Sequence, residues 1–116
     1  MQIIYIRDLL LRTEVGFNPH ELGKKQDVLL NIEIYFNFLG EEQSDEPSEA
    51  LDYKLLSKSI IEKVESKKYN LIEALAYDVS ELLLKNKRVI KVDITVDKPN
   101  ALRFARSVAF RMIKER

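Results

Sequence analysis

Four polar side chains occupy positions that the hydrophobic pattern of the chain does not explain, and all four lie in loops or at the ends of expected elements. They are Glu21, Tyr53, Glu73 and Lys98. Carboxylates, an amine and a phenol can bind polar groups, orient a water molecule and move protons. These residues are therefore the candidate site, and general acid–base chemistry is the candidate type of reaction.

Glu73 is embedded in the apolar segment Leu71-Ile72-Glu73-Ala74-Leu75, at the expected start of a helix. Its simplest role is to stabilise the positive end of the helix dipole. A carboxylate beside free backbone N–H groups can also accept two hydrogen bonds from an amidine-like edge, while a backbone N–H donates to a neighbouring carbonyl. Pterins and guanines present such an edge.

Lys98 ends an expected strand and precedes Pro99, which cannot extend a strand ladder. An exposed turn lysine is the simplest interpretation. Buried beside a carboxylate such as Glu21, the same lysine can organise a water molecule or accept a proton. Tyr53 is expected at a helix start, where a packing aromatic is common, but a tyrosine can also stack on a flat ring and pass a proton.

A second group of basic residues is a candidate site for a phosphorylated substrate. Arg103 and Arg106 follow Lys98 closely, and Arg12 is a further candidate. Guanidinium groups match the geometry of phosphate, although scattered arginines on a charged surface are the commoner explanation. His20 is most simply a surface residue.

The composition narrows the class of protein. The chain has 116 residues, 46% of them hydrophobic and 33% charged, which predicts one domain, residues 1–116. A domain of this size leaves little room for a large internal cavity, so a site for a sizeable substrate is expected to be shallow or shared between subunits. Without cysteine, and with one histidine, the chain has no residues for a disulfide framework or a thiolate or His-rich metal site.

Charge and hydropathy exclude further classes of partner. The 19 basic and 19 acidic side chains cancel, so no overall field attracts nucleic acid. No apolar run is long enough for a membrane span or an export signal, which predicts a cytoplasmic protein without membrane contacts.

The hydrophobic periodicity predicts four strands and two helices. Alternation predicts strands over residues 2–15, with a bulge near Arg7-Asp8, and over 26–37, 89–97 and 107–114. Apolar residues at helical spacing predict helices from about 53 to 67, capped by Asp52, and from Asn70, as the cap, to about 86. Loops are expected at 16–23, 40–49 and 98–101, the middle one a solvated acidic connection.

The order strand, strand, helix, helix, strand, strand predicts an α+β domain whose four-stranded antiparallel sheet is covered by two helices on one face. Strands of about ten residues without an internal proline leave open edges, and closure into an oligomeric barrel removes such edges. We therefore expect a ring-shaped homo-oligomer.

Several segments together resemble one known family, in order and over nearly the whole chain from Ile3 to about Phe110. The segments are Leu11-Arg12-Thr13, Val15-Gly16, Lys25-Gln26-Asp27-Val28, Ala50-Leu51-Asp52-Tyr53, Asn70-Leu71-Ile72-Glu73 and Asp97-Lys98-Pro99-Asn100-Ala101-Leu102-Arg103-Phe104-Ala105. They resemble the dihydroneopterin aldolases and, more closely, the dihydroneopterin triphosphate 2'-epimerases. The resemblance implies the tunnelling fold (T-fold), in which four subunits close their sheets into a barrel and two rings stack into an octamer, with active sites between neighbouring subunits.

The resemblance also implies roles for the candidate residues. Glu73 would bind the 2-amino and N3 groups of a pterin, with the backbone of Leu71 and Ile72 at the ring carbonyl. Tyr53 of a neighbouring subunit would line the ring and take part in proton transfer. Lys98, with ordered water, would remove the proton of the 2'-hydroxyl, and Glu21 would orient Lys98 and the substrate side chain. No metal or organic cofactor is implied.

Two reactions and one non-catalytic role remain open. The segments Leu11-Arg12-Thr13, Gln26-Asp27 and Ala101-Leu102-Arg103-Phe104-Ala105 resemble the epimerases, which favours inversion at C2', with Arg103 as a substrate-binding residue. Asn18-Pro19-His20 departs from the acidic residues of epimerases, so the contact of this loop with a phosphorylated tail is open. There are two alternatives: an aldolase that releases glycolaldehyde, and a pterin- or purine-binding module without activity.

Overall fold

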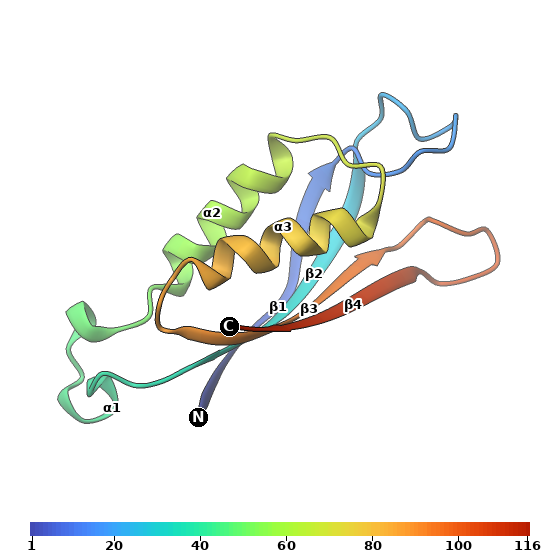
Figure 1. Cartoon of the computed structure of the whole chain (residues 1–116). Helices are drawn as coiled ribbons and strands as arrows, with labels where there is room; N and C mark the ends of the chain where they lie inside the picture. The colour runs from blue at the N-terminus through green and yellow to red at the C-terminus, as the bar shows by residue number, and fades with distance from the viewer.

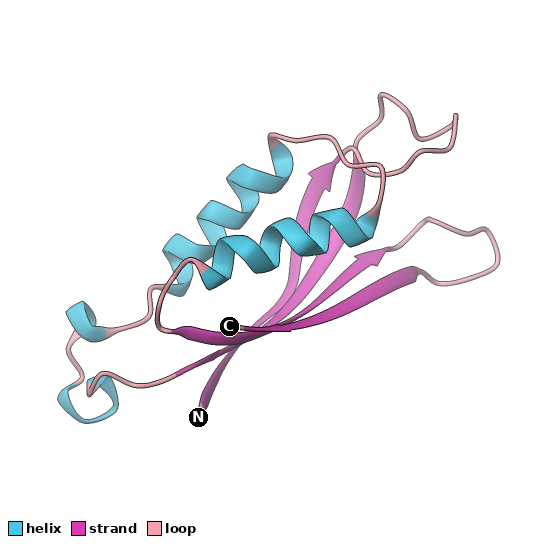
Figure 2. Cartoon of the chain, in the orientation of Figure 1, coloured by secondary structure: helices cyan, strands magenta, loops and turns pink.

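The computed structural model describes residues 1–116 as an antiparallel sheet with two helices on one face (Figure 1). The strands lie in the order β1-β2-β3-β4, each antiparallel to its neighbour. Their bounds are β1 Gln2–Thr13, β2 Gln26–Phe36, β3 Val89–Lys98 and β4 Val108–Glu115. Helices α2 (Tyr53–Glu65) and α3 (Ile72–Leu84) cover the same face of the sheet (Figure 2). The predicted α+β class and the ββααββ order are confirmed.

The core lies between the helices and the sheet. Alternate residues of β2 and β3 face the helices, and each helix turns one apolar stripe towards the sheet, so that 19 buried hydrophobic residues form one cluster. Its fully buried side chains include Val28, Leu30, Ile34, Ile60, Val64, Leu75, Val79, Leu83, Val92, Ile94 and Val96. Removal of this apolar surface from water is the main driving force that holds the two layers together.

A bulge in β1 keeps its apolar residues on the core side. The pairing with β2 shifts between Ile6 and Leu9, and Asp8 has a positive φ of 52°. The Asp8 N–H donates to the side-chain oxygen of Asn31 at 2.9 Å, and the Asn31 amide donates back at 3.1 Å. The bulge predicted near Arg7-Asp8 is confirmed.

The helix starts agree only in part with the sequence analysis. Asp52 caps α2 as predicted, because its carboxylate accepts from the Leu55 N–H at 2.9 Å. The predicted Asn70 cap is wrong: Leu71, in an extended conformation, precedes the helix, and no side chain caps its first turn. Leu55 and Leu71 have the helical spacing that predicts the apolar faces of these helices, but they are 59% and 44% exposed. The stripe of α2 begins at Leu56 instead, and Leu71 stands outside α3.

The acidic connection after β2 is more ordered than predicted. It contains the short helix α1 (Glu41–Ser44) and the 3-10 turn Pro47–Glu49, neither of which has a buried residue. Arg88 holds this segment, since its guanidinium donates to the Glu49 carbonyl at 2.7 Å and to the Glu41 carboxylate at 2.5 Å. This contact spans 47 positions between Glu41 and Arg88, so the local composition does not reveal it.

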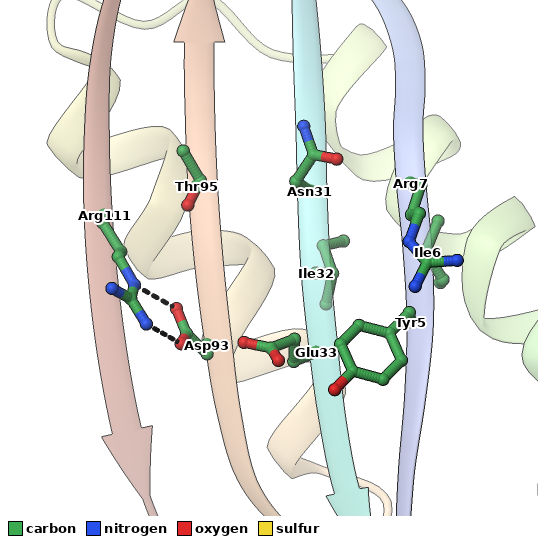
Figure 3. Close-up of a pocket in the computed structure, with 9 residues that line it drawn as sticks. All are labelled: Tyr5, Ile6, Arg7, Asn31, Ile32, Glu33, Asp93, Thr95 and Arg111. Atoms are coloured by element: carbon green, nitrogen blue, oxygen red, sulfur yellow. Dashed lines mark hydrogen bonds and ion pairs between the residues drawn. The ribbon is translucent and has the colours of Figure 1, made fainter.

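The face of the sheet away from the helices carries a cluster of polar side chains. Figure 3 shows its largest cavity, about 320 Å³, where Arg111 donates two hydrogen bonds to Asp93 at 2.9 and 2.6 Å and Glu33 lies beside Asp93. The Arg111 guanidinium holds the pKa of the Asp93 carboxyl below its usual value. None of the candidate site residues lines this cavity.

The outer edges of β1 and β4 have no strand partner within the chain. Open edges of this length are templates for pairing with another chain. The ring-shaped oligomer stays a prediction, which these edges motivate. None of the helices has the length and apolar character needed to cross a membrane.

Candidate active site

Three connections meet at one end of the sheet, where α3 begins (Figure 1). They are the loop between β1 and β2, the link between α2 and α3, and the turn between β3 and β4. Between them is a shallow pocket of about 200 Å³. Its lining residues are Gly16, Phe17, Asn18, Glu21, Asn70, Leu71, Ile72, Glu73, Lys98, Ala101 and Val108. The structure thus brings together five of the predicted residues, Glu21, Leu71, Ile72, Glu73 and Lys98.

Two predicted residues lie elsewhere in the chain. Tyr53 is the first residue of α2, at the opposite end of the helix layer from the start of α3 (Figure 1), and it is 62% exposed. Arg103 is exposed in the β3–β4 turn, with its guanidinium 5.4 Å from the ring centre of Phe104. The pocket of one chain is therefore built without either side chain.

Lys98 and Glu21 form a buried ion pair. The Lys98 ammonium donates to a carboxylate oxygen of Glu21, and the two side chains are only 11% and 6% exposed. Lys98 is the last residue of β3 and is buried like Val96 and Ile94, which alternate with it along the strand. The simple interpretation of Lys98 as an exposed turn residue is wrong, since the loop of Glu21 covers this strand end.

Two further side chains hold the Glu21 carboxylate. Gln26 donates from its amide to one oxygen at 2.9 Å and also to the Val15 carbonyl at 3.0 Å, and Asn18 donates to the other oxygen at 2.9 Å. Hydrogen bonds from Lys98 and Gln26 lower the pKa of Glu21 to about 2. Glu21 is therefore a permanent anion at neutral pH, suited to orienting groups rather than to accepting a proton.

The roles of Gln26 and Asn18 do not follow from the sequence alone. Gln26 occurs in one of the segments that carry the family resemblance, but as the first residue of β2 it gives no local sign of a polar partner. Asn18 stands three residues before Glu21, a spacing typical of side-chain contacts within a tight loop.

Gly16 makes room for this carboxylate. Its φ is +138°, and a Cβ atom built there would lie 2.3 to 2.4 Å from the carboxylate atoms of Glu21. Glycine is therefore required both by the backbone conformation and by the close approach of the side chain.

A short parallel bridge ties the loop of Glu21 to the start of α3. The Gly16 N–H donates to the Tyr69 carbonyl at 3.0 Å, and the Tyr69 N–H donates to the Glu14 carbonyl at 3.0 Å. Tyr69 is itself buried, and its hydroxyl donates to Asp78 at 2.9 Å. Burial and this carboxylate raise the pKa of Tyr69. Tyr69 thus positions two walls of the pocket, a role that the sequence analysis missed.

The third wall is the first turn of α3. Glu73 is its second residue and is exposed to the pocket. The first N–H groups of any helix lack intrahelical acceptors, and no side chain caps them here. A carboxylate and free N–H donors side by side can bind a flat ring that presents an N–H pair next to a carbonyl.

The pocket therefore combines a binding edge at Glu73 with an ion pair that can hold water and handle protons at Lys98. Nowhere in the chain do three or more His, Cys, Asp or Glu side chains cluster as a metal site. The expectation that no cofactor is needed stays a prediction.

The chain is similar to known proteins in sequence and in architecture. The family model described as dihydroneopterin aldolase matches residues 4–113. The dihydroneopterin triphosphate 2'-epimerase of Pseudomonas aeruginosa is 35% identical over 116 residues, which are 100% of this chain and 94% of the relative. The dihydroneopterin aldolase of Haemophilus influenzae is 29% identical over 114 residues, 98% of this chain and 97% of the relative. The crystal structure of Escherichia coli dihydroneopterin aldolase in complex with neopterin has a TM-score of 0.92 at 27% identity, covering 98% of this chain and 99% of that one.

The sheet, its helix layer and the pocket at the sheet end define an enzyme of the T-fold class. The chain belongs to the dihydroneopterin aldolase family. Some of its relatives in this family are named epimerases and others aldolases. The resemblance drawn from the sequence segments is thereby confirmed.

Proposed function

We propose that the protein is a dihydroneopterin triphosphate 2'-epimerase, which inverts C2' of the pterin side chain. The observation that carries this proposal is the buried Lys98–Glu21 pair in the same pocket as Glu73. A module that only binds the ring needs Glu73, but it does not need a buried ammonium–carboxylate pair in the same pocket.

Glu73 binds the ring in this proposal. Its carboxylate accepts from the 2-amino group and N3 of the pterin, and the backbone N–H groups at Leu71 and Ile72 donate to the ring carbonyl. The first turn of α3 supports this arrangement, because no side chain accepts a hydrogen bond from its N–H groups.

Lys98 acts at the side chain of the substrate. A water molecule held by Lys98 passes the proton of the 2'-hydroxyl to the imine nitrogen of the ring as the C1'–C2' bond breaks. The electron pair of that bond moves into the imine, which becomes a neutral enamine. Glu21, fixed by three donors, orients Lys98 and the departing aldehyde.

The fate of the aldehyde decides the product. If it rotates and C1' attacks the other face of its carbonyl, the C1'–C2' bond forms again with C2' inverted. If C1' is protonated and the aldehyde leaves, dihydroneopterin gives 6-hydroxymethyl-7,8-dihydropterin and glycolaldehyde. One pocket can support both outcomes, so aldolase activity is the second candidate, supported by the aldolase relatives that match almost the full chain.

The active site is completed by a second subunit in this proposal. The pocket of one chain, about 200 Å³, is smaller than the roughly 300 to 1,000 Å³ of pockets that enclose small ligands. Tyr53 is exposed at the other end of the helix layer, free to enter a neighbour's pocket, line the ring and pass a proton. The open β1 and β4 edges support a ring of four chains, or two such rings as an octamer.

The epimerase is favoured over the aldolase by two observations. Of the relatives compared above, the epimerase of Pseudomonas aeruginosa has the higher identity, 35% against 29% for the aldolase of Haemophilus influenzae. The segments Leu11-Arg12-Thr13 and Ala101-Leu102-Arg103-Phe104-Ala105 also resemble the epimerases.

The test incubates the purified protein separately with 7,8-dihydroneopterin and with its triphosphate. Chromatography that resolves neopterin, monapterin and hydroxymethylpterin forms then identifies the products. Inverted triphosphate as the main product supports the epimerase. Hydroxymethyldihydropterin with glycolaldehyde as the main product makes the protein an aldolase, and ring binding without any product makes it a binding module.

A further inference from the structure

We propose that Arg12 and Lys25, with Asn100, form a subsite for the triphosphate tail of the substrate. These residues line a second depression of about 240 Å³, together with Gln26 and Asp27, and none of the five is hydrophobic. This inference rests on the proposed function, because only a phosphorylated substrate has a tail for the subsite to bind.

The active-site pocket itself cannot hold a triphosphate. Its lining carries two carboxylates, Glu21 and Glu73, and one ammonium, Lys98, which is already paired with Glu21. A polyanionic tail inside this pocket would face net negative charge, and like charges at short range are destabilising. Cations that recognise the tail must therefore lie outside it.

The second depression adjoins the pocket at Glu21. Gln26 contacts both: it lines the depression, and its side-chain amide donates to Glu21 at 2.9 Å on the helix side of the sheet. The side chains of Arg12 and Asp27, which pair across β1 and β2, point to the opposite face of the sheet. Asn100 lines the depression and its neighbour Ala101 lines the pocket. In this proposal the tail of the substrate passes Lys98 and Glu21 and bends over the end of the sheet beside Asn100 to reach the polar depression.

The charges of the depression suit a phosphate chain. The Arg12 guanidinium is held in place by a hydrogen bond to Asp27 at 2.6 Å and by another to the Lys25 carbonyl at 3.3 Å. A fixed guanidinium retains N–H groups that match phosphate oxygens. Lys25 makes no ion pair in the chain, so its charge is available to a ligand.

The arginines of the β3–β4 turn are less suitable. Arg103 stacks on Phe104, and neither Arg103 nor Arg106 lines the pocket or the depression. The cations of the tail subsite are therefore Arg12 at the end of β1 and Lys25 just before β2, and the β3–β4 turn contributes Asn100 but neither of its arginines.

The test measures the affinities of oxidised neopterin and of neopterin triphosphate, used as unreactive analogues, by isothermal titration calorimetry. The variants are Lys25→Gln, Arg12→Gln and the double variant, with Lys24→Gln as the matched control, because Lys24 is an exposed neighbour that does not line the depression. Lys25→Gln is the cleaner single change, since Arg12→Gln also leaves Asp27 without its partner.

The readout is the ratio of the affinity for neopterin triphosphate to the affinity for neopterin. Partial unfolding of a variant would lower both affinities by the same factor and leave this ratio unchanged. We expect the wild-type protein to prefer the triphosphate, and each single variant to lower the ratio roughly 5-fold, the double variant about 10- to 30-fold, at low ionic strength. Salt should lower the wild-type ratio, and Lys24→Gln should leave it near the wild-type value. A wild-type ratio near one, or a ratio that the double variant retains, overturns the subsite.

The two proposals fail in different ways. A wild-type protein that inverts the triphosphate, with an affinity ratio insensitive to Arg12 and Lys25, refutes the subsite and leaves the epimerase. A protein whose triphosphate preference depends on both residues, yet that forms no inverted product, supports the subsite and refutes the epimerase.

Discussion

The Lys98 ammonium and the Glu21 carboxylate are in direct contact although 77 positions separate them along the chain. One ends β3 and the other lies in the loop that follows β1, and the fold buries both side chains. The buried carboxylate has three donors and the buried ammonium has one acceptor, and the pair lies in the same pocket as the exposed carboxylate of Glu73. In the proposed function, binding of the ring and handling of the proton therefore belong to different residues.

Replacement of Lys98 should affect turnover more than binding. Lys98→Met should lower kcat by roughly 10²- to 10⁴-fold, the usual contribution of acid–base groups, while the Kd for neopterin changes far less. Steady-state kinetics and calorimetry measure the two quantities, with Lys24→Met as the control for loss of a surface lysine. Because Lys98→Met leaves Glu21 buried without its cation, the double variant with Glu21→Gln should regain stability but not turnover. Recovery of turnover in the double variant would remove Lys98 from the chemistry.

Replacement of Glu73 should affect binding more than turnover. Glu73→Gln removes the charge that strengthens two hydrogen bonds to the ring, and the Kd for neopterin should rise roughly 10- to 100-fold. Glu62→Gln changes an exposed acid in the last turn of α2, outside the pocket, and is the matched control that should bind like the wild-type protein. Equal losses of affinity and turnover in the Glu73 and Lys98 variants would contradict the separate roles.

Glu21 should make the stability depend on acid. Its pKa is lowered to about 2 in the folded chain, below the ordinary value of 4.5, so the native state favours the charged form. This contribution is present above pH about 4.5 and is lost as the pH falls from there towards 2. Urea unfolding at fixed protein concentration, between pH 3 and about 6, should show a steeper loss for the wild-type protein than for Glu21→Gln. Identical pH profiles would show that Glu21 makes no such contribution.

Substitution of the two glycines in the Glu21 loop distinguishes the effect of backbone strain from the effect of a steric clash with Glu21. Gly16→Ala puts a methyl group against the Glu21 carboxylate, so both stability and kcat should fall. Gly23 also has a positive φ, +75°, but a methyl group there meets no atom within 4 Å. Gly23→Ala should thus cost only about 1 to 2 kcal/mol of strain and retain kcat. Unfolding curves and initial rates measure both, and an unaltered kcat in Gly16→Ala would argue against a fixed Glu21.

The shared site predicts complementation between inactive chains. Tyr53→Ala and Lys98→Met should each be inactive alone, but after they are mixed, unfolded and refolded together, about a quarter of the sites should combine an intact pocket with an intact neighbouring Tyr53. Activity of the mixture measures this directly. Lys98→Met mixed with Glu21→Gln is the control, because both changes fall in the pocket of one chain and no exchange repairs it. A mixture with no more activity than its components would contradict the contribution of Tyr53 from a neighbour.

Much of the fold follows from short-range patterns in the sequence. Alternation in β2 and β3 predicts their buried faces, and the break near Arg7-Asp8 predicts the bulge. The position of Asp52 before an apolar helical repeat predicts that it caps α2. Each of these features depends on neighbours along the chain, because a strand or helix repeats its orientation every few residues. The choice of Glu21, Glu73 and Lys98 as candidates also came from local exceptions to those patterns.

Only the tertiary structure decided how these residues meet. The burial of Lys98, the hydrogen bonds of Gln26 and Asn18 to Glu21, and the space left by Gly16 depend on one loop folding over the end of a distant strand. The bridge from Val15 to Tyr69 that fixes this loop likewise joins segments far apart in sequence. Local periodicity states which side of an element avoids water, but it does not state which element covers that side. The sequence by itself therefore determined the elements, their order and the kinds of side chain available for chemistry, whereas packing of the loop against the sheet and α3 determined the site.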